Sequence, residues 1–282
     1  MVENSPWIEW GGFGASLVFS HANGFPVGSY RPFLDSLKDS FEIFGWQARP
    51  LIPGSAPEEI SGWGDLSVDL KTGIESRFSG PVVGVGHSLG GVLNLLAAAS
   101  NPELYRALVL LDPVIFSGTR SLVWGQMKRW GRAHRLPLMA GALKRRDAWP
   151  DIETVRRSWI EKSAFEGWTN QAFEAYLKAG LEEDSETGGV RLRYPKAWEA
   201  RIFEVSPHNV WAEISKLVCP VLVLRGESSD TFTAGAAKRF VRKAPNCVCK
   251  VVKGTGHMLP MQRPEVVASM IVEWQREIPV NS

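Results

Sequence analysis

The chain has 282 residues, which is enough for one large domain with an insertion or for two modest domains. Apolar residues make up 44% and charged residues 22%, as in ordinary globular proteins, and the formal net charge is +2. This small charge gives no case for binding nucleic acid or a membrane surface, and no apolar run approaches the ~18 residues of a membrane span.

Strand and helix patterns alternate in the first and last parts of the chain. Strands are predicted at residues 16–20, 41–47, 82–85, 107–111, 220–226 and 248–252. Helices are predicted at residues 30–39, 65–78, 92–99 and 265–277. This alternation predicts an α/β fold with a mostly parallel, twisted sheet and helices on both faces.

The pattern changes between Pro113 and about Pro207, where strand signals disappear and the sequence reads as helical, basic and rich in tryptophan. The tryptophans are Trp124, Trp130, Trp149, Trp159, Trp168 and Trp198. A structureless connection of this length is uncommon, so residues 114–207 are predicted to form a helical cap over the carboxyl edge of the sheet. Residues 1–113 and 208–282 then form the core domain. Packing inside the cap is the commoner role expected of any one tryptophan, but some cap aromatics should line the gap above the sheet.

A G-x-S-x-G pattern runs from Gly86 to Gly90, between a predicted strand and a predicted helix. A serine at so sharp a turn has a strained backbone, and the residues two positions away on either side approach each other closely. Gly86 and Gly90 must therefore lack side chains. The pattern alone is weak, but its strand–turn–helix context makes Ser88 the predicted nucleophile, with the N-terminus of the next helix aimed at it.

A serine hydroxyl needs a base to take its proton, and the base needs an acid to orient it. Among five histidines, His257 lies in a glycine-flanked loop after the last predicted strand, from which its side chain can reach the turn. His257 is the predicted base. Two aspartates compete as the acid, Asp230 after strand 220–226 and Asp112 at the end of strand 107–111. Asp230 is preferred, because Asp112 is also explained as a turn residue before Pro113.

Backbone N–H groups are needed to stabilise the negative charge that develops on the substrate oxygen. Leu89, which follows the nucleophile, is predicted to supply one. The second is expected from the loop after the first predicted strand, from either Asn23 or Ala22. The alternative for Asn23 is that its side chain braces this loop.

Together these features resemble the α/β-hydrolase fold superfamily, and within it the capped serine esterases and lipase-like members. The matching segments are the oxyanion loop at residues 21–25, the nucleophile turn at 86–90, the acid loop at 226–230 and the base loop at 256–257. The resemblance implies Ser88, Asp230 and His257 as a catalytic triad and Asn23 as an oxyanion donor. Two features depart from it: Ala22 replaces the usual glycine, and residues 50–55 lack the Asp-x-x-Gly-x-Gly-x-Ser loop common in such proteins.

The leading hypothesis is a serine hydrolase that cleaves carboxylic esters through an acyl-enzyme. The alternatives are a carbon–carbon bond hydrolase acting on β-diketone-like substrates and a small-ligand receptor of the same fold that turns over negligibly. No cofactor or metal is expected, because the sequence has neither metal-ligand spacing nor a phosphate-binding glycine loop. The abundance of tryptophan favours an apolar or aromatic substrate.

A cytoplasmic location is predicted from two observations. The first residues lack the basic start and apolar centre of a secretory signal. The three cysteines, Cys219, Cys247 and Cys249, are an odd number and are expected to be free thiols in a reducing compartment.

Overall fold

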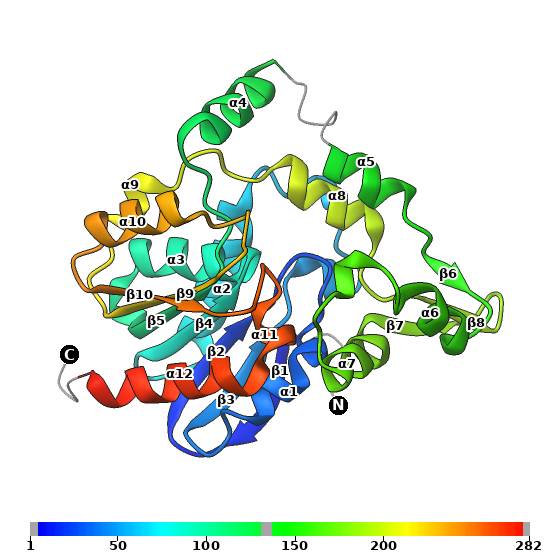
Figure 1. The fold of residues 1–282 in the computed structure, drawn as a ribbon, viewed down its shortest axis with the longest axis horizontal. Helices are drawn as coiled ribbons and strands as arrows, with labels where there is room; N and C mark the ends of the chain where they lie inside the picture. The colour runs from blue at the N-terminus through cyan, green and yellow to red at the C-terminus, as the bar shows by residue number, and fades with distance from the viewer. Residues whose placement is uncertain (1–4, 131–136, 279–282) are drawn as a thin grey trace.

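The computed structural model describes residues 5–130 and 137–278. Its centre is a seven-stranded sheet with the strand order β1-β3-β2-β4-β5-β9-β10 (Figure 1). The strands are β1 (Trp7–Gly12), β2 (Ala15–Ser20), β3 (Phe41–Trp46), β4 (Val82–His87), β5 (Tyr105–Leu111), β9 (Val221–Gly226) and β10 (Cys247–Val252). Only β1 pairs antiparallel, with β3, and the other pairs are parallel. The predicted mostly parallel α/β sheet is therefore confirmed.

Helices cover both faces of this sheet. They are the short helix α1 (Arg31–Asp35) and the longer helices α2 (Trp63–Arg77), α3 (Leu89–Ser100), α10 (Ala234–Lys243) and α12 (Pro264–Glu277). Buried strand residues alternate between the two faces: Val82 packs in the cluster that contains α2 and α3, and Val83 packs in the cluster that contains α1 and α12. This burial on both sides explains why the central strands read as continuous apolar runs.

The insertion between β5 and β9 contributes a second layer over the sheet (Figure 1). Its helices are α4 (Gly118–Arg129), α5 (Pro137–Lys144), α6 (Ile152–Trp159), α7 (Asn170–Gly180) and α8 (Lys196–Glu204). After α8 the chain returns to the sheet through the short helix α9 (Trp211–Ile214). We refer to residues 114–207 as the insertion.

The prediction of an insertion without strands is wrong. β6 (Ala148–Trp149), β7 (Leu181–Asp184) and β8 (Gly189–Leu192) form a three-stranded antiparallel sheet in the order β6-β8-β7. A turn joins β7 to β8, in which Gly188 has a φ of 71° and the Asp184 carboxylate accepts from Thr187 Oγ1 at 2.7 Å. The sequence Asp-Ser-Glu-Thr-Gly-Gly was the available signal, since glycine permits this backbone conformation.

Three further differences concern single elements. β1 and α10 were not predicted, and the helix predicted at residues 30–39 is shorter, with α1 ending at Asp35 and turns leading into β3. All three cysteines are free thiols, as expected. None of the helices in the described ranges is long and apolar enough to cross a bilayer.

Candidate active site

Ser88 occupies a strained turn between β4 and α3. Its φ is 55° and its ψ is −113°, a combination that few non-glycine residues adopt. A Cβ added to Gly86 would lie 2.3 Å from the backbone of Gly90, and one added to Gly90 would lie 2.1 Å from the carbonyl oxygen of Ser20. The expected requirement for glycine at both positions is thus confirmed, and the backbone at the end of β2 is one of the surfaces that imposes it.

His257 bridges Ser88 to a buried carboxylate. Its Nε2 lies 3.0 Å from Ser88 Oγ, and its Nδ1 lies 2.8 Å from Asp112 Oδ2. The Asp112 side chain is completely buried, whereas 26% of the His257 side chain is exposed. Hydroxyl, imidazole and carboxylate therefore stand in the serial arrangement of a serine nucleophile, its base and an orienting acid.

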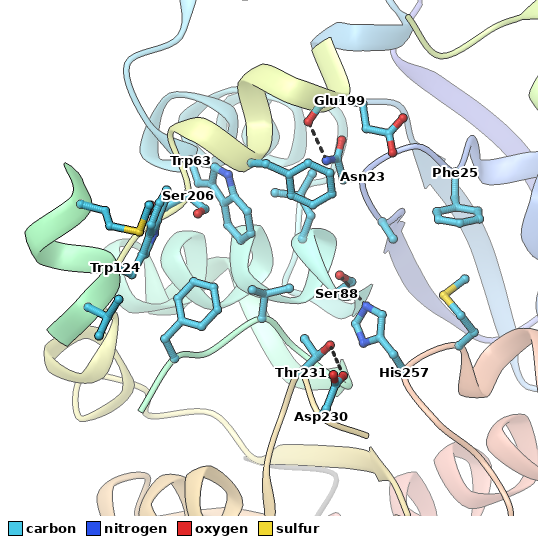
Figure 2. Close-up of a pocket in the computed structure, with 18 of the residues that line it drawn as sticks. Asn23, Phe25, Trp63, Ser88, Trp124, Glu199, Ser206, Asp230, Thr231 and His257 are labelled. Atoms are coloured by element: carbon cyan, nitrogen blue, oxygen red, sulfur yellow. Dashed lines mark hydrogen bonds between the residues drawn. The ribbon is translucent and has the colours of Figure 1, made fainter. Parts of the chain in front are cut away.

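The sequence-based preference for Asp230 as the partner of His257 is wrong. Asp230 is exposed on the wall of the same pocket, where the Thr231 hydroxyl donates to its Oδ1 at 3.5 Å (Figure 2). The reason is the strand order: β5 lies directly beside β4, so Asp112 leaves the sheet next to Ser88, and Ser88 N–H donates to Leu111 O at 3.0 Å. β9, which carries the Asp230 loop, is one strand further away.

The end of β9 and the loop that follows it hold Asp112 instead of supplying the partner of His257. Gly226 N–H donates to Asp112 Oδ1 at 3.0 Å, and Ser229 Oγ donates to Asp112 Oδ2 at 2.5 Å. Ser229 Oγ in turn accepts from the backbone N–H groups of Thr231 and Phe232. Asp112 itself has a φ of 42°, so a second residue of the site has an unusual backbone conformation. Sequence reasoning did not identify Ser229.

A buried chain of hydrogen bonds connects the loop of His257 with the loop that follows β2. His87 Nε2 lies 2.9 Å from His257 O, and Tyr30 Oη lies 2.8 Å from His87 Nδ1. A carbonyl can only accept, so His87 carries its proton on Nε2 and accepts from Tyr30. Ala22 N–H completes the chain by donating to Tyr30 Oη at 3.1 Å. Burial, with a smaller contribution from His257, lowers the pKa of His87 to about 3, which keeps this ring neutral.

The same contacts distinguish between the two oxyanion candidates of the loop after β2. Ala22 N–H is already bonded to Tyr30, whereas the hydrogen bonds that the described residues make with Asn23 involve its side chain. Asn23 Nδ2 donates to Glu199 O at 3.0 Å (Figure 2), and Asn23 Oδ1 accepts from Tyr194 Oη at 2.9 Å. The Asn23 side chain thus braces the loop, as the alternative interpretation expected. Leu89 is the first residue of α3, so its N–H has no acceptor within the helix.

A third histidine, His21, makes its hydrogen bonds to backbone groups other than those of Ser88. His21 is buried: its Nδ1 lies 2.8 Å from Ala22 O and its Nε2 accepts from Ala48 N–H at 3.1 Å. Burial lowers the pKa of His21 to about 4, although the bond to Ala22 opposes this. His134 lies outside the described residues.

A pocket of about 680 Å³ opens above Ser88 and His257 (Figure 2). The insertion contributes Val114, Phe116, Thr119, Val123, Trp124, Met127, Glu199, Phe203 and Ser206 to its wall. The aromatic lining expected from the insertion is therefore present, but Trp124 is the only one of the six insertion tryptophans among the described lining residues. Trp149 and Trp159 pack instead in a cluster within the insertion. Within residues 5–130 and 137–278, no group of three or more side chains could hold a metal ion.

Comparison with known proteins assigns the chain to a family. The sequence model described as "Alpha/beta hydrolase family" matches residues 17–270. The chain is 25% identical over 232 residues to the abhydrolase domain-containing protein AKT2 of Alternaria alternata, covering 69% of this chain and 82% of that protein. It is 24% identical over 263 residues to the 2-(acetamidomethylene)succinate hydrolase of Mesorhizobium japonicum, covering 93% and 88%.

Solved structures show the same fold. A crystal structure of E-2-(acetamidomethylene)succinate hydrolase superimposes with a TM-score of 0.79 at 23% identity, covering 96% of this chain and 94% of the other. MenH from S. aureus superimposes with a TM-score of 0.72 at 16% identity, covering 97% and 98%. The family match extends from β2 into α12 and includes Ser88, Asp112 and His257. The chain therefore belongs to the alpha/beta hydrolase family.

Proposed function

We propose that the protein is a serine hydrolase that cleaves carboxylic esters through an acyl-enzyme. The observation that carries this proposal is the unbroken contact from Ser88 Oγ through both ring nitrogens of His257 to Asp112 Oδ2, at 3.0 and 2.8 Å. Ser88 is the nucleophile, His257 the base, and Asp112 the acid in place of Asp230. The Asp112 carboxylate accepts hydrogen bonds from Gly226 N–H and Ser229 Oγ, which hold it in place beside His257.

In the acylation step, Ser88 Oγ attacks the ester carbonyl carbon while its proton passes to His257 Nε2. The carbonyl oxygen becomes an oxyanion, held by the N–H groups of Leu89 and Asn23. His257 then gives its proton to the leaving alcohol oxygen, and an acyl-Ser88 ester remains. A water molecule reverses these roles: it loses a proton to His257, attacks the acyl carbon and releases the acid, and Ser88 Oγ regains the proton.

An apolar or aromatic substrate fits the pocket best. Phe116, Trp124 and Phe203 from the insertion and Trp63 from α2 provide aromatic surface around the space beside Ser88. The insertion acts in this proposal as a cap that excludes water and binds the acyl or alcohol group.

A second candidate is hydrolysis of substrates that contain no ester, which includes the carbon–carbon bond cleavage considered above. The names of two relatives favour it. The substrate named for the Mesorhizobium japonicum protein carries an acetamido group and two carboxylates. The substrate named for an Acinetobacter baylyi protein, which is 22% identical over 276 residues, carries an N-methylformamido group and two carboxylates. Both names describe succinates that carry an N-acylaminomethylene group, which contains an amide and no ester.

A substrate panel on the purified protein tests these candidates. Aryl esters of increasing acyl length, a β-diketone and an N-acyl enamine dicarboxylate would be compared, with the Ser88→Ala variant as the blank. Turnover of esters that is lost in the variant supports the proposal. Turnover of the diketone alone would instead support carbon–carbon bond hydrolysis, and turnover of the N-acyl enamine alone would support amide hydrolysis. No turnover of any of these compounds would contradict both candidate functions.

A further inference from the structure

The Asn23 side chain joins the oxyanion loop to the insertion. Its amide nitrogen donates to the backbone oxygen of Glu199 at 3.0 Å, and its amide oxygen accepts from the Tyr194 hydroxyl at 2.9 Å. We propose that Tyr194 is a positioning residue for the chemical step, which it supports by holding Asn23 so that the Asn23 N–H points at the substrate oxygen. This inference rests on the proposed serine hydrolase function.

The orientation of the Asn23 amide follows from its two partners. The Glu199 carbonyl can only accept, so it must face the amide NH₂ group. The other partner, Tyr194, is 2% exposed, and burial raises the pKa of its phenol well above the usual value. Tyr194 therefore keeps its proton and donates it to the amide oxygen. Exchanging the two ends of the amide would place two acceptors, Asn23 Oδ1 and Glu199 O, against each other.

The core and the insertion hold different residues of the same loop. On the core side, Tyr30 accepts from Ala22 N–H, and His21 Nδ1 lies 2.8 Å from Ala22 O. One residue later, the two side-chain hydrogen bonds of Asn23 described above both run to the insertion. The next residue, Gly24, has a φ of 84°, so the loop turns immediately after Asn23. The position of the Asn23 peptide is thus determined in part by the segment that carries Tyr194 and Glu199.

That segment is itself firmly attached. Trp63 Nε1 of α2 donates to Ile202 O at 2.8 Å, and the Arg201 guanidinium donates to Ile60 O at 2.7 Å, so α8 is bonded directly to the core. Within the insertion, Arg145 Nη1 lies 3.1 Å from Glu199 Oε2. Tyr194 is therefore presented to Asn23 from an anchored helix start, which is what a positioning role requires.

An oxyanion donor acts mainly in the transition state, because the charge on the substrate oxygen develops there. Displacing the Asn23 N–H should lower kcat and leave KM nearly unchanged, and a misplacement of an ångström can cost up to about 10²-fold. The insertion would then contribute to the rate of the chemical step as well as to substrate choice. A purely structural role for Tyr194 would reduce stability without this separation of kcat from KM.

The test compares Tyr194→Phe with Tyr176→Phe. Each removes one hydroxyl from a buried insertion tyrosine and keeps its ring. The Tyr176 hydroxyl accepts from Arg145 Nη2 at 2.9 Å, and in the described part of the chain no hydrogen bond joins it to the oxyanion loop, where the Tyr176 ring packs on Phe25. We expect Tyr194→Phe to lower kcat on a short aryl ester about tenfold or more with an unchanged KM, and Tyr176→Phe to leave both unchanged. The affinity for an arylboronic acid, which forms a tetrahedral adduct on serine, should fall in parallel with kcat.

A double variant links the effect to Asn23. If Tyr194 acts through Asn23, then Asn23→Ala/Tyr194→Phe should be no slower than Asn23→Ala alone. Equal kcat and boronate affinity for Tyr194→Phe and the control, in folded proteins, would overturn the inference, as would additive effects in the double variant. If the unsubstituted protein neither hydrolyses esters nor binds the boronate, the proposed function itself is wrong, and the role of Tyr194 is rejected with it.

Discussion

The Ser229 hydroxyl lies 2.5 Å from Asp112 Oδ2, the same carboxylate oxygen that faces His257 Nδ1. Two donors thus converge on one oxygen, and Gly226 N–H occupies the other. A carboxylate that is fully buried would be costly without such partners, because burial disfavours its charged form. The end of β9 and the loop after it therefore hold the carboxylate that faces the His257 imidazole.

Removing the nucleophile should abolish hydrolysis without unfolding the protein. Ser88→Ala deletes one oxygen at a position where Ala fits the space, and the loss of a triad member costs several orders of magnitude in kcat. The measurement is ester turnover together with a thermal melt of both proteins. Retained turnover in a folded variant would refute the assignment of Ser88, and a fluorophosphonate adduct on Ser88 in the unsubstituted protein would support it.

The two aspartates should differ sharply in their importance. Asp112→Asn keeps the side-chain shape but removes the charge that holds the imidazole tautomer, and the corresponding change in another serine hydrolase lowers kcat by ~10⁴. Asp230→Asn is the matched control and should retain most of the activity. Steady-state kinetics on both folded variants decides the matter, and a larger loss for Asp230→Asn would contradict the arrangement described here.

Ser229→Ala should weaken both the fold and the reaction. The variant removes a hydrogen bond to a buried carboxylate, a kind of contact that contributes about 1.5–3 kcal/mol to stability. We expect a lower free energy of unfolding and a kcat reduced by about tenfold, because Asp112 becomes less well held. The control is Ser228→Ala, whose hydroxyl donates to Thr255 O at 3.1 Å instead. Similar kcat values for the two variants would argue against this role of Ser229.

Acid should destabilise the protein through its buried histidines. The pKa values of His87 and His21 are lowered to about 3 and about 4, so the folded state keeps both rings neutral where the unfolded chain protonates them. The stabilisation is therefore complete above the unfolded pKa of about 6.5 and is lost as the pH falls towards 4. For each ring, the free energy of unfolding falls by up to about 1.4 kcal/mol for each pH unit of acidification in this range.

Urea unfolding between pH 7 and pH 5 measures how the free energy of unfolding depends on pH. This dependence gives the number of protons taken up on unfolding, and His87→Gln should reduce that number by about one relative to the unsubstituted protein. An unchanged slope in a folded His87→Gln protein would show that His87 does not remain neutral in the folded state.

Insertion tryptophans should fall into two groups. Trp124 lines the pocket, and its indole N–H donates to Ser206 O at 3.1 Å, so Trp124→Phe should reorder preferences across an ester chain-length series. An apolar pocket discriminates between substrates that differ by about one methylene group by about 1–3 kcal/mol. Trp149→Phe, in the internal cluster of the insertion, is the control and should lower stability without reordering. A uniform loss across all esters for Trp124→Phe would mean that the substrate binds elsewhere.

The core of the fold could be predicted from periodicity, but the acid could not. Short buried strands and amphipathic helices leave a local signal, so β4, β5 and α3 were predicted within a few residues. Choosing between Asp112 and Asp230 requires the order of strands in the sheet, which depends on contacts between distant segments. Both residues follow a strand and both precede His257, so chain order alone fits either.

Two other features were hidden for different reasons. The β7–β8 hairpin has strands of four residues with charged positions, too short for an alternation to stand out. The partners of Asn23 come from more than 170 residues away along the chain, at Tyr194 and Glu199. The sequence pattern pointed to the loop after β2, while the preference for Asn23 over Ala22 as the proposed oxyanion donor depended on which N–H the core already uses.

The chain of bonds from Ala22 through Tyr30 and His87 to His257 has a consequence for protein engineering. The residue before the nucleophile is usually treated as a variable position of the G-x-S-x-G pattern, yet here it bonds at one ring nitrogen to a tyrosine 57 positions away and at the other to a carbonyl 170 positions away. Grafting this turn onto another sheet would therefore transfer a serine without its supports. A functional transplant has to carry Tyr30 and the His257 loop as one set with His87.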